Sequence, residues 1–220
     1  MAMRRAVLLA VWLAAVVSIA PARAQSGDIL RPSDGSSVDE HIARELQEHR
    51  GVVILDAILS TPAIGGDTTR CAFPVLTLGQ ASNKDAPQKT VRGSVVGGGG
   101  KLVAFGAITS LPPGEHLVLS IACNNTSESY SGPHAKFQVR AGEIVNVGAL
   151  RIDHKSDALF SQTGKMHRAV EDLNPDIVAF LKARAPRAMT NVVRRPMTML
   201  GAADNAARTR TRVCGPLGCL

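Results

Sequence analysis

Short runs of β-branched and apolar residues, separated by turn residues, constrain the fold of this chain more than any other feature. Seven such runs follow one another, at 51–59, 71–78, 91–96, 102–109, 117–123, 135–140 and 144–152. Turn-forming stretches such as Leu111-Pro112-Pro113-Gly114 separate them. No helical stretch of about ten residues lies between the runs, so the crossovers of a parallel sheet are missing. The pattern therefore predicts a mainly β fold, an antiparallel β-sandwich of about seven strands.

Two stretches outside this region have the signals of helices. Ser37 precedes a charged stretch with a thin apolar stripe, and Glu40 stands where a capping box needs an acid. Further on, Asn174-Pro175-Asp176 is a typical helix start, and Pro186 ends the apolar pattern. We therefore expect a flexible leader with a possible short helix at 25–50, the sandwich at 51–152, a helical extension at 153–200 and a flexible basic tail at 201–220.

The first 24 residues have the organisation of a signal peptide. Arg4 and Arg5 precede an apolar run at 6–19, and Pro21-Ala22-Arg23-Ala24 supplies small residues at the cleavage positions. Cleavage between Ala24 and Gln25 is expected, because the apolar run is shorter than the ~20 residues of a membrane-spanning helix. The sequence thus predicts a periplasmic or secreted protein whose mature chain has no transmembrane span.

Four cysteines in an exported chain predict two disulfides. Three pairings are formally possible. Cys71 and Cys123 lie in or beside strand-like runs, whereas Cys214 and Cys219 flank a short Gly-Pro-Leu-Gly turn. These positions favour the pairs Cys71–Cys123 and Cys214–Cys219. A thiolate metal site is not expected, because the Cys-x-x-Cys spacing of zinc sites is absent from the sequence.

Charge and aromatic content limit the classes of partner. The chain has a net charge of +7, and from Arg151 onward 12 Lys and Arg stand against 6 Asp and Glu. A solvated basic tail is the simplest interpretation; the alternative is contact with anionic lipid or cell-wall polymer. The arginines that would make this contact are Arg184, Arg187, Arg194, Arg195, Arg208, Arg210 and Arg212. Aromatic residues are only 3% of the chain, which argues against a stacking platform for nucleic acid.

No motif predicts catalytic, cofactor-binding or metal-binding residues. His41, Glu45 and His49 share one helical face, but about 12 Å of helix separates the two histidines, so a solvated charged face is expected. Gly97–Gly100 and Lys101 do not match a phosphate-binding loop. A site on His116 and His134 would need the fold to bring them near carboxylates, namely Glu115, Glu143 or Asp153.

Two hairpin sequences resemble a known family. Leu111-Pro-Pro-Gly-Glu-His116 and Phe137-Gln-Val-Arg-Ala-Gly-Glu-Ile-Val-Asn-Val-Gly148 are similar to the last hairpins of small prealbumin-like β-sandwich domains in exported bacterial proteins and lipoproteins. The likeness covers about 50 residues. Residues 173–197 are also similar to the C-terminal region of uncharacterised exported bacterial proteins. The resemblance implies a sandwich fold and no activity. No Cys follows the cleavage site, so no lipid anchor is expected.

These observations lead to one expected function and two alternatives. The expected function is that of an exported cell-envelope protein, a structural or binding β-sandwich module without catalytic activity or cofactor, whose partner is an envelope protein. The first alternative is an anionic-surface binder that uses the basic C-terminal part. The second is an envelope enzyme or metal-binding protein whose residues converge only in the folded chain.

Overall fold

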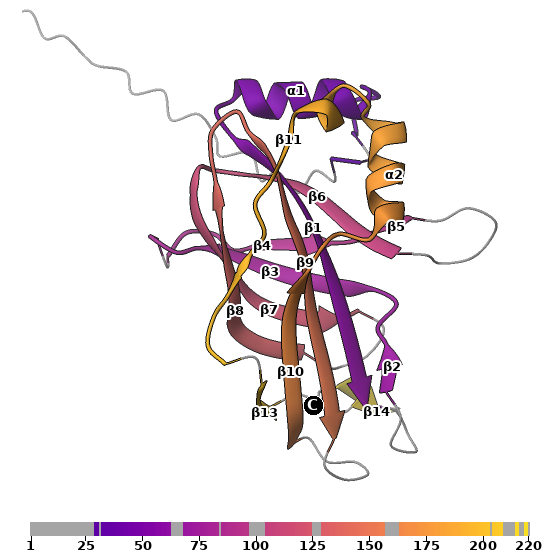
Figure 1. Cartoon of the computed structure of the whole chain (residues 1–220), viewed down its shortest axis with the longest axis vertical. Coiled ribbons are helices and arrows are strands. Elements are labelled where there is room, and N and C mark those ends of the chain that lie inside the picture. Colours follow the sequence, from indigo (N-terminus) through magenta and orange to yellow (C-terminus); the bar gives the residue numbers. More distant parts are fainter. Residues whose placement is uncertain are drawn as a thin grey trace, which may run out of the picture.

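The computed structural model describes residues 29–30, 32–62, 68–83, 85–96, 104–124, 129–156, 163–202, 204–208, 214–215 and 218–219. The expected signal peptide with its cleavage site, the Gly97–Gly100 run, Arg210 and Arg212 lie outside these ranges. Within them the chain is mainly β, with two large sheets, a two-stranded ladder and two α-helices (Figure 1). In the part of the chain that the structure describes, no helix is both long and apolar enough to span a membrane.

The larger sheet is mixed. Its strands follow the order β13-β10-β9-β1-β6-β5, with β11 pairing β9 and β2 pairing β1. The bounds are β1 (Gly51–Pro62), β2 (Thr68–Arg70), β5 (Ser94–Val96), β6 (Ala104–Leu111), β9 (Ile144–Ser156), β10 (Thr163–Glu171), β11 (Val192–Arg194) and β13 (Asp204–Arg208). β1 and β9 run parallel, as do β9 and β11, so the prediction of purely antiparallel pairing is wrong. Between β1 and β9 the chain forms β3, β4, β7 and β8 of the second sheet, and this long connection replaces the helical crossover that parallel neighbours usually need.

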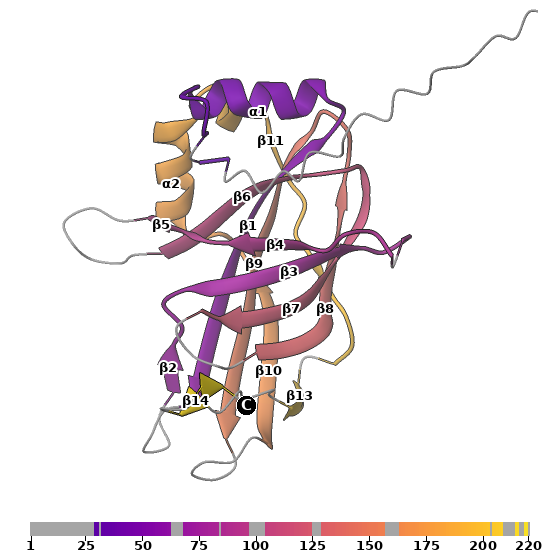
Figure 2. The same ribbon diagram turned by 180° about the vertical axis from the view of Figure 1, so that it is seen from behind.

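The smaller sheet is antiparallel throughout its described strands, in the order β12-β8-β7-β3-β4. Its strands are β3 (Pro74–Gln80), β4 (Lys89–Arg92), β7 (Gly114–Cys123), β8 (Ser129–Val139) and β12 (Thr198–Met199). β3, β4 and β7 run across the direction of β1, β9 and β10 in both views (Figures 1 and 2). A separate two-stranded ladder joins β14 (Cys214–Gly215) to β15 (Gly218–Cys219).

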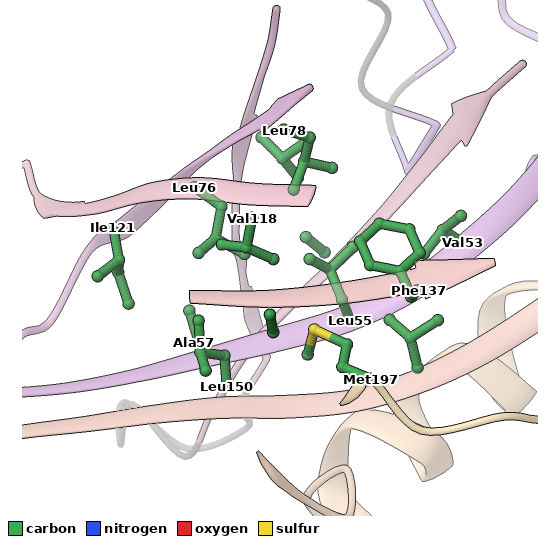
Figure 3. Close-up of a cluster of buried hydrophobic side chains, with 14 of the residues drawn as sticks. Val53, Leu55, Ala57, Leu76, Leu78, Val118, Ile121, Phe137, Leu150 and Met197 are labelled. Atoms are coloured by element: carbon green, nitrogen blue, oxygen red, sulfur yellow. The ribbon is translucent and has the colours of Figure 1, made fainter. Parts of the chain in front are cut away.

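The main hydrophobic core receives side chains from both sheets. Val53, Leu55 and Ala57 of β1 alternate with residues that point to the opposite face. Figure 3 shows them near Leu76 and Leu78 of β3, among other buried aliphatic side chains. This core is built mainly from Val, Leu and Ile, in a chain of which only 3% is aromatic.

A second hydrophobic cluster covers the outer face of the larger sheet. α1 (Val38–Gln47), α2 (Pro175–Arg184) and the 3₁₀ turn η1 (Ala188–Asn191) contribute to it. Val52 and Ile54 of β1 pack in this cluster, whereas their neighbours in the strand pack in the main core. β1 is therefore buried on both faces, which explains why its sequence is almost continuously apolar.

Both predicted helices are confirmed, together with their caps. The Ser37 side chain accepts the Glu40 backbone N–H, and the Glu40 carboxylate accepts the Ser37 backbone N–H. The Asn174 side chain accepts the Asp176 backbone N–H at the start of α2. Each of these hydrogen bonds satisfies a donor that the first helical turn leaves free.

The chain has more strands than the sequence predicts, and the expected helical extension is only partly helical. β9 continues past Ile152, β10 follows, and residues 192–199 then cross from the larger sheet, through β11, to the smaller sheet, through β12. We call residues 192–199 the crossing segment. Strands of two or three residues carry too little sequence to show a period of two. In β10 a charged residue, Arg168, occupies a buried position, which obscures the alternation.

The Cys71–Cys123 disulfide is confirmed. Its Cα atoms lie 5.7 Å apart, and it joins the chain just before β3 to the end of β7. Cys214 and Cys219 are partners in the backbone register of β14 and β15. Their side chains lie outside the described part of the structure, so that pair remains a prediction.

Candidate functional site

A groove of about 550 Å³ lies between α1, η1 and the turn that joins β8 to β9. Its lining includes the apolar side chains of Ile42, Ile144 and Ala188, all of which are buried. Charged residues line it as well, namely Asp39, Glu40, Glu143 and Arg187. The volume is in the range of clefts that bind ligands or short peptide segments. We call this feature the α1–η1 groove.

Asp39 connects two walls of the α1–η1 groove. One carboxylate oxygen accepts the Ala188 backbone N–H at 2.9 Å, and the other accepts the Arg187 backbone N–H at 3.2 Å. An acceptor from α1 thus caps the start of η1, nearly 150 positions later in the sequence. This contact fixes where Arg187 and Ala188 lie relative to α1.

The β8–β9 turn forms another wall. Gly142 adopts a left-handed conformation with φ of 68°, which glycine takes without strain, and its N–H donates to the Arg50 carbonyl. The Glu143 carbonyl accepts the Val52 N–H at the start of β1. The Glu143 carboxylate accepts two hydrogen bonds from Arg195 of the crossing segment. Contacts from two parts of the chain, residues 50–52 and Arg195, therefore position this turn.

The charge of the groove lining is acidic. Three carboxylates, those of Asp39, Glu40 and Glu143, stand beside the single guanidinium of Arg187 among the lining residues. Hydrogen bonds from Ser37, first from its backbone and then from its hydroxyl, lower the pKa of Glu40, so this exposed carboxylate stays ionised at neutral pH. The acidic lining contrasts with the net charge of +7 of the whole chain.

A polar network lies beneath α1 and fixes the helix to both sheets. Glu45 accepts a hydrogen bond from the Ser110 hydroxyl and forms an ion pair with Arg50, and Lys89 donates to the Ser110 carbonyl at 3.1 Å. Burial, followed by the nearby charge of Arg50, lowers the pKa of Lys89. Glu45 is only 7% exposed, so the prediction that it lies on a solvated face is wrong. The reason is that Arg50 and Ser110 supply buried partners that the helical pattern does not reveal.

The histidine and carboxylate candidates do not converge. His116 shares a hydrogen bond with the Pro112 carbonyl at 2.8 Å and stacks on Phe137, while His134 contacts the Tyr130 carbonyl at 3.0 Å. Burial lowers the pKa of both imidazoles. The carboxylates have other partners, and the pairs are Glu115–Lys136, Glu143–Arg195 and Asp153–Arg151.

No metal centre is formed by the residues that the structure describes. Among them, no three or more His, Cys, Asp or Glu side chains lie close enough together to bind an ion. His41 and Glu45 do approach each other, with 3.9 Å between Nε2 and Oε1. His49 follows the end of α1 with φ of 58°, outside the helix on which the three side chains were expected to share a face.

The arginines of the predicted anionic-surface contact lie in different environments. Arg194 pairs with Asp172, and Arg195 pairs with Glu143. The Arg184 guanidinium lies 5.9 Å from the ring centre of Phe180, and Arg187 lines the α1–η1 groove. The side chain of Arg208 lies outside the described part. Ion pairing therefore occupies two of the four arginines whose side chains are described.

Sequence reasoning missed two buried polar features. Asp56 is 2% exposed within β1; one carboxylate oxygen accepts the Ala57 N–H, and the other has no hydrogen-bond partner among the described residues. Desolvation raises the pKa of this carboxyl group to about 6. Tyr130 and His154 form a buried hydrogen bond of 2.8 Å between the phenol and Nδ1. The only sequence signal for the buried Asp56 was its place as a single Asp inside an apolar run. The sequence contains no signal for the hydrogen bond between Tyr130 and His154.

Comparison with known proteins identifies no family. No protein-family model matches the chain, and no curated protein matches it. Among solved structures, a leucine-rich repeat protein from Bacteroides thetaiotaomicron VPI-5482 matches with 12% sequence identity and a TM-score of 0.30. That match covers 53% of this chain and 13% of the other. A likeness of this size carries no argument about fold or function, so the prealbumin-like resemblance remains a prediction.

Proposed function

We propose that this protein is an exported binding module of the cell envelope, a β-sandwich that receives a partner protein in its α1–η1 groove. One observation carries the proposal: an apolar floor with charged edges lies between elements that long-range contacts fix in place. A preformed surface of this kind loses little conformational entropy when a partner binds. Binding requires no group beyond those already present in the groove.

The rest of the described chain supports a binding role over a catalytic one. The histidines and carboxylates considered for chemistry have separate partners, as set out above. A general acid or base needs a free proton-transferring group at a reachable substrate position. The carboxylates of the groove lining already accept hydrogen bonds within the protein, Asp39 from the backbone of η1, Glu40 from Ser37 and Glu143 from Arg195. The signal-like segment at 1–24 and the Cys71–Cys123 disulfide agree with a protein that works outside the cytoplasm.

Site-specific photo-crosslinking tests the proposal. A photoreactive amino acid replaces Ala43, an exposed residue of α1 that lines the groove, in cells that produce the protein. The matched control carries the same residue at Thr90, an exposed position of β4 away from the groove lining. We expect a discrete protein adduct from Ala43 and none from Thr90. Equal adducts from both positions, or none from either, would contradict the groove as the binding surface.

The same cells test export. The intact mass of the protein from the periplasmic or secreted fraction should correspond to residues 25–220. A mass that includes residues 1–24 would contradict cleavage, and recovery only from the cytoplasm would remove the cell envelope from the proposal. Adducts with membrane lipid or wall polymer that disappear with added salt would instead favour the anionic-surface alternative.

A further inference from the structure

We propose that the α1–η1 groove binds an extended, basic segment of a partner protein, which adds as a strand to the open edge of β11. This inference rests on the proposed function and specifies the partner's chemistry. Apolar side chains of the segment would contact the groove floor, and its Lys or Arg residues would approach the carboxylates of the lining. Three independent observations support it: an open strand edge, an exposed valine and a local inversion of charge.

The first observation is the position of β11 in the larger sheet. β10 pairs with β9 only from Ala149 onward, so the place beside the first residues of β9 is open to another strand. β11 takes that place through three register pairs, the first of which is Val192 with Ile144. Among the described strands, β11 pairs with β9 alone. Its other backbone edge is therefore a template for an added strand.

The second observation is the exposure of Val193. Its side chain is 42% exposed, and Phe73 is the only other large hydrophobic residue that the described part of the chain exposes. Val193 of β11 lines the α1–η1 groove, and so does Asn191 at the end of η1. Side chains alternate along a strand, so a segment that pairs with β11 can direct every second side chain toward the groove. An isolated exposed valine is ordinary, but one beside both a bare strand edge and an apolar floor fits a docking site.

The third observation is charge complementarity. Asp39, Glu40 and Glu143 exceed the one basic lining residue in number, on a chain that is basic as a whole. Arg194 pairs with Asp172, and Arg195 neutralises Glu143, so Asp39 and Glu40 remain against Arg187, an excess of one negative charge. A basic segment is therefore favoured over an acidic one. Complementary charge of this kind acts mainly on the association rate and on the choice of partner.

Proline limits the length of the added pairing. Pro196 follows Arg195 and has no backbone N–H to donate. The edge available to a partner therefore ends near Arg194, and the segment that pairs with it is short. Affinity must come from the side chains on the groove floor as well as from backbone hydrogen bonds.

A random octapeptide library displayed on phage, selected on the folded mature protein (residues 25–220), tests the inference. We expect enrichment of peptides with apolar residues at every second position and at least one Lys or Arg. Calorimetry with a synthetic copy of the most enriched peptide then gives its Kd. N-methylation of one pairing backbone amide should weaken binding about tenfold, because it removes a hydrogen bond and blocks the strand edge.

Variants of the protein separate the groove from the rest of the surface. Val193→Arg should weaken the same peptide about tenfold by loss of apolar contact and by charge repulsion. Phe73→Arg, a matched change at the other exposed hydrophobic residue, should leave the Kd unchanged. Glu40→Gln keeps a capping-box residue but removes the charge, so it should reduce the salt dependence of binding. Circular dichroism checks that each variant is folded.

The outcomes distinguish this inference from the proposed function. Enrichment of acidic peptides would overturn the inference, and so would peptides whose Kd is unchanged by N-methylation at every position. Either result would do so even if Val193→Arg weakens their binding and thereby shows that they occupy the groove. Failure to enrich any peptide above an empty-surface control would also overturn it. The photo-crosslinking at Ala43 decides separately whether the groove binds a partner at all.

Discussion

Arg195 and Glu143 form a two-point ion pair that ties the crossing segment to the β8–β9 turn. The distances are 2.7 Å from Nη1 to Oε1 and 2.9 Å from Nη2 to Oε2. The pair is shielded, since the Arg195 side chain is 28% exposed and that of Glu143 is 14% exposed. Parallel hydrogen bonds between a guanidinium and a carboxylate are among the strongest polar contacts in proteins. The hydrogen bond from Arg195 to Glu143 also raises the pKa of the arginine.

Removing Arg195 should destabilise the protein measurably. We expect Arg195→Ala to lower the free energy of unfolding by about 1–2 kcal/mol, because Glu143 loses both charge-assisted hydrogen bonds in a partly buried position. Urea unfolding followed by circular dichroism measures this. The matched control is Arg194→Ala, whose partner Asp172 is 72% exposed and whose removal should cost at most about 0.5 kcal/mol. Equal losses of unfolding free energy in the two variants would show that the two-point geometry of the Arg195–Glu143 pair contributes nothing to stability.

The buried carboxyl group of Asp56 should make the protein more stable in mild acid. Burial raises its pKa in the folded state from the ordinary value of 3.8 to about 6, so the fold favours the protonated form. That contribution is fully present below pH 3.8 and is lost as the pH rises through 6. At pH 8, Asp56→Asn should therefore be more stable than the wild type by on the order of 2–3 kcal/mol. Urea unfolding at pH 8 and pH 5 should show this advantage shrinking at the lower pH; a constant difference would contradict the raised pKa.

His134 should have the opposite effect. Burial is the main cause that lowers the pKa of this imidazole. The hydrogen bond to the Tyr130 carbonyl raises the pKa, and the nearby charge of Arg168 lowers it further. The neutral form is therefore favoured, and its contribution to stability is lost as the pH falls through the folded pKa, below 6.5. An NMR titration should give His134 a midpoint below 6.5, with the resonance assigned by its loss in His134→Gln. A midpoint at or above the ordinary value would show that the ring is solvated.

Local signals in the sequence predicted the elements whose physical cause is local. The capping residues Ser37, Glu40 and Asn174 gave the helix starts, because a cap bonds backbone groups within its own first turn. Runs of β-branched residues likewise predicted the long strands. The sequence also favoured Cys71–Cys123, since both residues lie beside runs that became neighbouring strands.

The features that the sequence did not predict depend on contacts between distant residues. The parallel β1–β9 pair requires knowledge of how the chain returns after the second sheet. The α1–η1 groove exists because Asp39 reaches Ala188 and Glu143 reaches Arg195, and no periodic pattern encodes either contact. Glu45 was misplaced for the same reason, since its buried partners come from β6 and from the residue before β1.

The disulfide should contribute strongly to stability. Cys71 and Cys123 are separated by 52 positions, and closing a loop of this length restricts the unfolded chain by about 4 kcal/mol in the chain-entropy model. The Cys71→Ala/Cys123→Ala double variant should lose a free energy of unfolding of that order. Reductant should destabilise the wild type and leave the double variant unchanged. If reductant, added while the wild type is unfolded, leaves its free energy of unfolding unchanged, these two cysteines are not bonded to each other.

Close packing between β6 and α2 gives a last prediction. A Cβ added at Gly106 would lie 2.5 Å from Cγ2 of Ile177, a fully buried side chain of α2. Gly106→Ala should therefore lower the free energy of unfolding by about 1–3 kcal/mol through overpacking. Ile177→Ala alone should cost about 2–5 kcal/mol by leaving a cavity. In the double variant the added methyl group occupies part of that cavity, so the combined loss should be smaller than the sum of the single losses. Additive losses in urea unfolding would show that α2 does not pack on Gly106 in solution.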